Sequence, residues 1–398
     1  MEKILTLYRN AFSGLSKPAW MLAVVMFINR SGSMVIPFLS VYLTESLGFS
    51  LKQAGFMLSL FGFGSMGGSF LGGWLTDRIG HFRVQFWSLT IGGSLFLFLA
   101  QLKTFVTFAA GIFILSLVSE CLRPANSSSV SFYAKPENIT RAFSLNRMAI
   151  NLGFAIGPAV AGLLATVSYR LLFLADGFTC ITAGLFFYFY FRRLPGSRKK
   201  ALVSSAALVQ IRSPYRDIKF ILFVLLSTLF ACVFFQFFST LPLYYRQVRG
   251  LTEAQIGMLL GLNGIVVFSL EMLVVYLAGK RFQPATLICF GAFLVGLSFI
   301  LLNLVQANWI VFASMVILSI AEIFSLPFMA TIPVKRSGET NRGTYMGLYN
   351  ISFSSSFVLG PFIGTTIIDR FGFNILWWSS GLLVFATGIA FNQLVKKI

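Results

Sequence analysis

The sequence predicts an all-α integral membrane protein with twelve transmembrane helices in two six-helix halves. The chain has 398 residues, a mean hydropathy of +0.83 and only 11% charged residues, whereas a soluble domain carries roughly 25%. So few charges cannot cover a water-facing surface, which nearly excludes a soluble enzyme. Because a membrane-spanning helix needs about 20 mostly apolar residues, a chain of this length has room for about a dozen.

Twelve apolar runs have the required length, and they are numbered here as spans 1 to 12 in chain order. Each is expected to be a helix, because a helix satisfies its own backbone polar groups in lipid. The first six runs lie at about 19–46, 52–76, 84–102, 104–131, 144–167 and 171–191. The second six lie at about 219–244, 253–278, 284–303, 308–333, 342–367 and 371–394.

The formal net charge of +19 arises from 31 Lys and Arg against 12 Asp and Glu. In a soluble protein this excess would suggest a nucleic-acid partner, but here the basic residues lie between the apolar runs, so no such partner is expected. Most of them share a side with the N-terminus. The positive-inside rule therefore predicts a multi-pass protein of the plasma (inner) membrane with both termini in the cytoplasm.

The residues before span 1 have a helical pattern of their own. Ile4, Leu5, Tyr8, Phe12 and Leu15 fall at helical spacing. The pattern predicts a short helix on the inner membrane face, in contact with membrane lipids. A disordered tail is the alternative.

The two sets of six runs repeat one another at an offset of about 202 residues. The basic segment 192–218 separates an N-terminal half at 1–191 from a C-terminal half at 219–398 and is expected to be a cytoplasmic loop. Two such halves are typical of secondary transporters whose substrate site lies between them. A membrane scaffold without transport offers no reason for this symmetry. The matching positions include Gly55 and Gly257, Glu120 and Glu322, and Gly157-Pro158 and Gly360-Pro361.

The segment between spans 2 and 3 contains a glycine-rich motif with one acid, from Gly73 to Gly80. The glycines allow a close helix approach and a tight turn, and Asp77 can pair with a cation or a helix N-terminus across the interface of the halves. Such a pair acts as a conformational latch. The motif resembles the loop signature of the major facilitator superfamily at Gly73, Asp77, Arg78 and Gly80. It departs from that signature at His81 and Phe82, where the family usually has basic residues.

Span 5 contains Gly153, Gly157, Pro158 and Gly162 in the pattern G-x-x-x-G-P-x-x-x-G. Small residues at this spacing permit a close helix crossing, and proline bends a helix, so plain packing is one interpretation. The pattern also resembles the fifth-span signature of proton-coupled antiporters, especially the twelve-span drug:proton branch of the same superfamily. The resemblance covers essentially the whole chain. It implies the major facilitator fold, a monomer, and a small-molecule substrate moved by the proton gradient without a cofactor.

Charged and amide side chains inside the apolar runs are expected to be functional, because burying them in lipid is costly. The candidates for proton coupling are Glu120, Arg123, Glu271 and Glu322. The candidates for a substrate cavity are Asn29, Arg30, Gln236, Asn263, Glu271 and Glu322. They lie on spans 1, 4, 7, 8 and 10, which the resemblance assigns to the cavity. The sequence contains no metal-ligand cluster, ATP-binding loop or catalytic constellation.

Several of these charges also have a structural interpretation. Glu120 and Arg123 are i,i+3 neighbours and could neutralise each other, although Arg123 matches the fourth-span arginine that the resemblance associates with proton transfer. Glu322 could pack against polar backbone. Glu271 has no charged neighbour on its own span and is either a proton carrier or partnered across the cavity. Asp176, near the outer end of span 6, is expected to contact lipid headgroups.

The leading hypothesis is a proton-coupled secondary transporter that works by alternating access and exports small amphipathic organic compounds as a multidrug-type antiporter. The span-5 pattern favours it, as does a phenylalanine-rich run from Phe230 to Phe238, which could wall an apolar pocket or face lipid. The alternative is a proton-coupled symporter that imports a small zwitterion or peptide. Arginines in the first half and glutamates in the second would then hold the carboxylate and the amine of the substrate.

Overall fold

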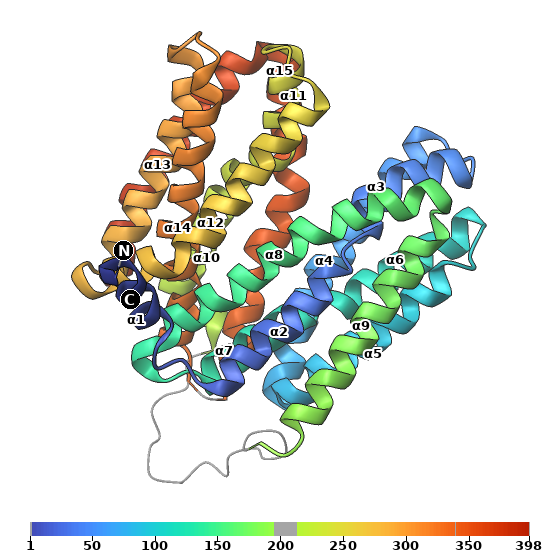
Figure 1. The fold of residues 1–398 in the computed structure, drawn as a ribbon, viewed down its shortest axis with the longest axis horizontal. Coiled ribbons are helices and arrows are strands. Elements are labelled where there is room, and N and C mark those ends of the chain that lie inside the picture. Colours follow the sequence, from blue (N-terminus) through green and yellow to red (C-terminus); the bar gives the residue numbers. More distant parts are fainter. Residues whose placement is uncertain (1, 195–212, 339, 398) are drawn as a thin grey trace. The chain divides into compact units, whose positions relative to one another are not determined.

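The computed structural model describes residues 2–194, 213–338 and 340–397, so most of the predicted loop at 192–218 lies outside the described residues. All regular elements in the described part are helices (Figure 1). Within these described ranges, eleven helical segments are long and apolar enough to cross a membrane. The last of them, α15 (Arg342–Val395), has 54 residues and turns at Gly372, where φ is +79°. At 1.5 Å per residue it is long enough for two spans of a bilayer, so the prediction of twelve spans is confirmed.

Contacts between the helices divide the chain into two compact units. Unit 1 consists of Met1–Gly14, Pro214–Arg336 and Ser355–Ile398, and unit 2 consists of Leu15–Ser213 and Ser337–Ser354. Helix α15 therefore contributes its first turns to unit 2 and the rest to unit 1. These units follow the two predicted halves over most of the chain and differ from them at α1 and at the start of α15.

Unit 2 holds spans 1 to 6. Its helices are α2 (Lys17–Ser31), α3 (Val35–Val41) with a π-helical turn (Tyr42–Ser46), α4 (Leu51–Ile79), α5 (His81–Leu99), α6 (Phe105–Glu120), α7 (Leu122–Tyr133), α8 (Ile139–Val167) and α9 (Arg170–Phe191). Helices α5 and α9 run side by side, and α2 packs along α8 (Figure 1).

Unit 1 holds spans 7 to 10 and most of α15. Its other helices are α1 (Glu2–Phe12), α10 (Ile218–Phe234) with a 3₁₀ turn (Phe235–Phe238), α11 (Thr240–Gln247), α12 (Glu253–Arg281), α13 (Pro284–Leu304) and α14 (Trp309–Arg336). Helices α13 and α14 lie side by side (Figure 1). The predicted N-terminal helix is present as α1, and it packs on α12, where the Tyr8 hydroxyl donates to the carbonyl of Ser269 at 2.6 Å.

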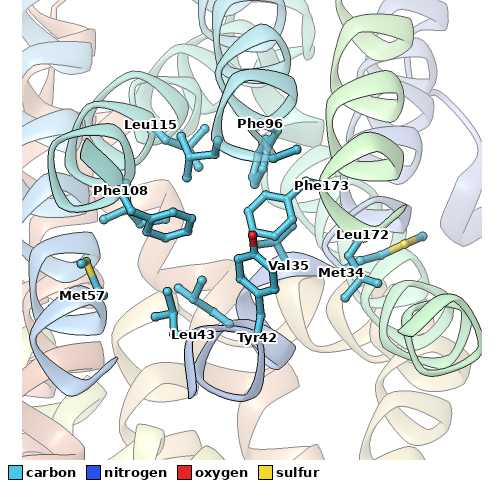
Figure 2. Close-up of a cluster of buried hydrophobic side chains, with 14 of the residues drawn as sticks. Met34, Val35, Tyr42, Leu43, Met57, Phe96, Phe108, Leu115, Leu172 and Phe173 are labelled. Carbon is cyan, nitrogen blue, oxygen red and sulfur yellow. The ribbon is translucent and has the colours of Figure 1, made fainter. Parts of the chain in front are cut away.

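The core of unit 2 is a cluster of aromatic and aliphatic side chains from α3 and the π-helical turn after it and from α4, α5, α6, α8 and α9 (Figure 2). The ring of Tyr42 lies 5.0 Å from that of Phe173 and 6.1 Å from that of Phe108, measured between centroids. Phe108 and Phe173 are each at most 1% exposed. Rings in such tilted and edge-on arrangements stabilise one another beyond their burial, so this cluster fixes the end of span 1 that follows α3.

The core of unit 1 is also aromatic. Trp377 is fully buried, with its ring stacked on Phe299 at 5.1 Å and met edge-on by Tyr244 at 5.5 Å. Phe230 and Phe234 of the predicted phenylalanine wall are buried and stacked in this unit. These two rings thus pack within the protein and do not face lipid.

The internal repeat is visible in how the spans begin and end. Helices α4 and α12 start with the same capping box, Ser50 with Gln53 and Thr252 with Gln255. The start of span 1 meets the end of span 4 through a hydrogen bond of 2.6 Å from the Ser16 hydroxyl to the Tyr133 carbonyl. At the equivalent place in unit 1, Asp217 and Arg336 form a two-bond ion pair, at 2.7 and 3.0 Å.

Candidate functional site

Span 1 is interrupted near its middle. Helix α2 ends at Ser31 and α3 begins at Val35, which leaves backbone N–H groups that need acceptors outside the helix. The carboxylate of Asp176 in α9 accepts from the N–H of Met34 at 2.9 Å and from that of Val35 at 3.0 Å. Asp176 is only 2% exposed. The prediction that it contacts lipid headgroups is wrong, because its two carboxylate oxygens accept hydrogen bonds from the backbone of this buried break.

The span-5 motif lies directly against the break. A Cβ atom placed on Gly153 of α8 would lie 2.7 Å from the Cβ and 2.9 Å from the carbonyl carbon of Arg30, and one on Gly157 would lie 3.2 Å from the carbonyl oxygens of Arg30 and Ser31. At Gly162 the nearest atom, on Phe38, is 4.0 Å away. Helix α8 continues through Pro158. The first two glycines of the motif therefore allow α8 to contact the backbone of the interrupted span 1.

A cavity of about 80 Å³ lies beside the break within unit 2. This volume suits a few water molecules and is well below the roughly 300 Å³ or more of drug-sized ligand pockets. Unit 2 on its own therefore offers a small chamber with both polar and apolar walls. The polar residues that line it include Asn29, Arg30, Ser88, Ser119, Glu120 and Asp176.

The carboxylate of Glu120 stands on the wall of this chamber. Glu120 is the last residue of α6, where span 4 is interrupted at Cys121. Its Oε2 lies 2.5 Å from Nε of Arg123, and its Oε1 accepts from a second guanidinium nitrogen at 3.3 Å. On the same chamber, Arg30 faces the ring of Phe154 at 5.4 Å. The structure thus brings Arg30, Glu120 and Arg123 together, with Glu120 and Arg123 in direct contact.

The latch motif meets the start of α15. Asp77 accepts from the N–H of Gly343 at 2.6 Å and of Thr344 at 2.7 Å, and also from the Thr344 hydroxyl. It therefore caps the N-terminus of that helix, where an anion is favourable. A Cβ on Gly73 would lie 2.6 Å from the carbonyl oxygen of Gly343 and 2.9 Å from Cα of Gly347. The absence of a side chain at Gly73 lets the two backbones touch.

The other motif residues shape the turn that follows. The Arg78 guanidinium lies 4.2 Å from the centre of the Trp74 ring and is exposed. Gly80 has φ +88°, a value that favours glycine, and it separates α4 from α5. His81, the first residue of α5, turns inward, with its Nδ1 2.9 Å from the Ser129 hydroxyl. Of the four motif residues, Asp77 makes the cap, Gly73 allows the close helix approach and Gly80 makes the turn, whereas Arg78 stays exposed.

Replacing Asp77 with Asn should release the first turn of α15. An amide has one acceptor oxygen and no charge, so at least one of the two backbone bonds is lost. Because a hydrogen bond to a charged group contributes about 1.5 to 3 kcal/mol, amide exchange at Gly343 and Thr344 should accelerate by about ten- to a hundredfold. Hydrogen exchange with mass spectrometry measures this rate. The neighbouring Arg78→Gln is the matched control, and an equal acceleration there would contradict the role of Asp77.

Unit 1 contains a second polar group of predicted residues. The amide of Asn263 in α12 donates to the Ser319 hydroxyl at 3.0 Å and to the Glu322 carboxylate at 3.3 Å, both in α14. Glu271 is fully buried two turns further along the same face of α12. Asn263 and Glu322 are therefore brought together, and Glu322 is partnered by a side chain as well as packed within the helix pair.

Gln236 lies at the interruption of span 7, between α10 and α11. Its amide nitrogen donates to the carbonyls of Cys232 at 3.0 Å and Gly360 at 2.8 Å, and its oxygen accepts from Thr240 at 2.7 Å. These bonds hold the break in place, as Asp176 does in unit 2. Gly360, the repeat mate of Gly157, packs here against the backbone of Cys232. Contact between Gln236 and a substrate stays a prediction.

Sequence reasoning missed the interruptions of spans 1, 4 and 7 and the role of Asp176. A local signal for the first break exists, since Gly32 and Pro37 stand within an apolar run and both disfavour a continuous helix. Gly32 is also required by packing, because a Cβ there would meet the Thr179 hydroxyl at 1.7 Å. No local signal identifies Asp176 as the partner of the break.

Comparisons with known proteins agree with this architecture. The model of the Major Facilitator Superfamily matches residues 19–361. An uncharacterized MFS-type transporter of Bacillus subtilis, YttB, is 28% identical over 389 residues, covering 94% of this chain and 95% of that protein. The Na(+), Li(+), K(+)/H(+) antiporter of Planococcus maritimus is 25% identical over 384 residues, covering 87% and 88%.

A multidrug resistance protein and a solved structure extend the comparison. The multidrug resistance protein MdtH of Photorhabdus laumondii is 22% identical over 345 residues, covering 84% of this chain and 82% of that protein. The crystal structure of the human organic anion transporter MFSD10 shares the fold, with a TM-score of 0.74 at 14% identity, covering 94% of this chain and 98% of that one. Since the family model matches most of the chain and the fold is shared, the protein belongs to the major facilitator superfamily of membrane transporters.

Proposed function

We propose that this chain is a proton-coupled antiporter that exports small amphipathic organic compounds by alternating access. The observation that carries the proposal is the carboxylate of Glu120, which is 6% exposed, bonded to Arg123 and set on a water-sized chamber beside Arg30. Proton binding to this carboxylate competes with its charge-assisted bond to Arg123. In the proposal, breaking that bond is the step that couples the proton to a movement of the chain.

The cycle follows from this competition. When Glu120 is ionised, it holds Arg123 and closes the end of α6 onto α7. When a proton reaches Glu120 through the chamber, the charge-assisted bond to Arg123 weakens, and α7 is free to move relative to α6 at Cys121. Protonation from outside then accompanies displacement of the substrate. Burial in unit 1 makes Glu271 and Glu322 further candidates for carrying the proton.

The latch supplies the conformational part of the cycle. The distribution of basic residues supports placing both termini, and with them the Asp77 latch, on the cytoplasmic side of the plasma membrane. While Asp77 caps α15, the first turns of α15 stay bound to the cytoplasmic end of α4. Release of the cap allows α15 to move, as alternating access requires. A single chain contains both predicted halves, so a monomer suffices for this cycle.

The names of two relatives support proton exchange and the export of compounds. One relative is named a Na(+), Li(+), K(+)/H(+) antiporter and another a multidrug resistance protein. The alternative function, import of a zwitterion or peptide by symport, draws its support from the charge distribution. Arg30 and Arg123 belong to unit 2, whereas Glu271 and Glu322 belong to unit 1.

Purified protein in liposomes with a trapped pH-sensitive dye tests the proposal. Under an imposed pH gradient, lipophilic cations should drive proton flux opposite to their own movement, and dipeptides should not. Flux in the same direction as the substrate, seen only with zwitterions, would establish the symport alternative instead. Absence of flux with every compound would remove the case for proton coupling.

The Glu120→Gln variant should lose proton flux to the level of protein-free liposomes, because a glutamine cannot bind and release the proton. The matched control is Glu137→Gln, which alters an exposed carboxylate in the turn before α8 and should leave the flux unchanged. If Glu120→Gln retains coupling and Glu271→Gln or Glu322→Gln loses it, the assignment of the proton to Glu120 is wrong.

A further inference from the structure

We propose that α1 is a reversible strap between the two units, and that its docking on α12 restrains their separation on the side of the membrane that carries the N-terminus. Helix α1 belongs to unit 1, whereas the chain from Leu15 onward belongs to unit 2. The helix therefore packs on one unit and is joined directly to the first span of the other. The inference rests on the alternating access of the proposed function and goes beyond it, because it concerns a restraint on that movement.

The docked face of α1 is apolar and makes one specific hydrogen bond. Ala11 and Phe12 follow Tyr8 at helical spacings of three and four residues, so the three side chains lie on one face. Ala11 is fully buried, and Tyr8 and Phe12 are half-buried. The Tyr8 hydroxyl donates to the carbonyl of Ser269 in α12 at 2.6 Å. Packing and this bond hold α1 on unit 1, whereas Arg9 on the other face is exposed.

Helix α1 is too short to cross a membrane. Its 11 residues span about 16 Å, against a hydrocarbon core of about 30 Å. It can therefore leave α12 without moving a membrane span. Helix α15, which also passes from unit 2 to unit 1, has no such freedom, because its 54 residues are long enough for two spans.

The connection from α1 to span 1 is short and is fixed at its far end. Helix α1 ends at Phe12, and Ser16 is the N-cap of α2, where its hydroxyl oxygen accepts from the N–H of Ala19 at 3.2 Å. The same hydroxyl donates to the carbonyl of Tyr133 in α7 at 2.6 Å. The φ of +74° at Gly14 turns the chain between these points. Span 1 is thus anchored in unit 2 at its start, with only residues 13–15 between that anchor and α1.

A link of this length makes the docking of α1 a restraint on the two units. The four residue steps from Phe12 to Ser16 reach at most about 14 Å when fully extended. Separation of the units beyond this reach requires α1 to leave α12, which breaks the Tyr8 bond and exposes Ala11. Alternating access moves one half against the other. Docking therefore favours the conformation that is closed on the N-terminal side, and loss of docking shifts the population toward the open one.

Lengthening the link separates the restraint from the docking. Six glycine and serine residues inserted between Gly14 and Leu15 add about 20 Å of reach and leave the docked face unchanged. The full chain with this insertion should show a larger open population than the wild type. The same insertion after the exposed Lys103, in the connection between α5 and α6 within unit 2, is the matched control and should leave the population unchanged.

Spin labels at Lys135→Cys and Gln283→Cys report the open population as a longer distance between the units. Both positions are exposed and lie in the connections between spans 4 and 5 and between spans 8 and 9. Since each span crosses the membrane once, these connections are on the same side as the N-terminus. The chain without the two substitutions, taken through the same labelling, corrects for its four natural cysteines.

The docking bond itself is tested by Tyr8→Phe, which keeps the ring and removes the donor hydroxyl. Loss of one hydrogen bond changes an equilibrium by about two- to tenfold. The amides of α1 should exchange with solvent faster by this factor, and the open population should rise with them. Should the chain with the lengthened link not fold, Tyr8→Phe decides alone, since unchanged distances in that variant reject the strap.

The outcomes distinguish the strap from the proposed function. If Asp77→Asn raises the open population and the lengthened link does not, alternating access stands and the strap is rejected. If neither change alters the distance, both are rejected. The distance measurement needs neither substrate nor a proton gradient, so a larger open population in a chain that shows no proton flux would support the strap and remove the proposed antiport.

Discussion

Replacing Asp176 with Ala should lower the free energy of unfolding by about 2 to 6 kcal/mol, since its carboxyl group accepts two buried backbone hydrogen bonds and each buried donor left without an acceptor costs about 1 to 3 kcal/mol. The N–H groups of Met34 and Val35 would remain in the protein interior without this acceptor. We expect the interrupted span 1 to be the first part of unit 2 to loosen. Unfolding in mixed detergent micelles measures the loss.

Two control variants separate the loss of these two hydrogen bonds from the loss of a carboxylate at any other position. Asp176→Asn keeps one acceptor oxygen and should lose about half as much stability as Asp176→Ala. Asp369→Ala removes an exposed carboxylate and should leave the free energy of unfolding within about 0.5 kcal/mol of the wild type. If Asp176→Ala proved as stable as Asp369→Ala, the break would not depend on Asp176.

The second large effect is expected at the glycine that touches span 1. Gly153→Ala places a Cβ 2.7 Å from the Cβ of Arg30 and 2.9 Å from backbone atoms of Arg30 and Ser31. Backbone atoms cannot swing aside, so α8 must move away from the break. Overpacking of this kind costs about 1 to 3 kcal/mol, and we expect a value near the upper end together with loss of transport.

The same motif contains its own control. Gly162→Ala meets its nearest neighbour, on Phe38, at 4.0 Å, which is ordinary van der Waals contact. This variant should keep both its melting temperature and its proton flux. Equal damage from Gly153→Ala and Gly162→Ala would mean that the motif acts through helix flexibility and not through contact with the break.

The membrane spans and the contacts between residues close together in the sequence could be predicted from the sequence. Each span is a continuous apolar run, and hydropathy identifies such runs whatever lies beside them. The contact between Glu120 and Arg123 follows from their i,i+3 spacing. For Asp77 the sequence allowed a cation or a helix N-terminus as the partner, and the structure shows the second.

The breaks and their partners could not be predicted in the same way. A hydropathy window averages over the few residues between α2 and α3, so an interrupted span looks continuous. Asp176 is 142 residues from Met34, and the amide of Asn263 reaches Glu322 from another helix. Such contacts depend on packing between helices, which a single sequence without homologues does not encode in any local pattern.

The distance along the chain between the break and Asp176 has a consequence for biosynthesis. Span 1 is made first, and Asp176 arrives only with span 6, so the nascent chain must insert an interrupted helix whose cap does not yet exist. Unsatisfied backbone groups cost several kcal/mol each in hydrocarbon. We therefore expect a chain truncated before span 6 to keep span 1 at the insertion machinery or in contact with water. Release of the first half into lipid would then await synthesis of α9.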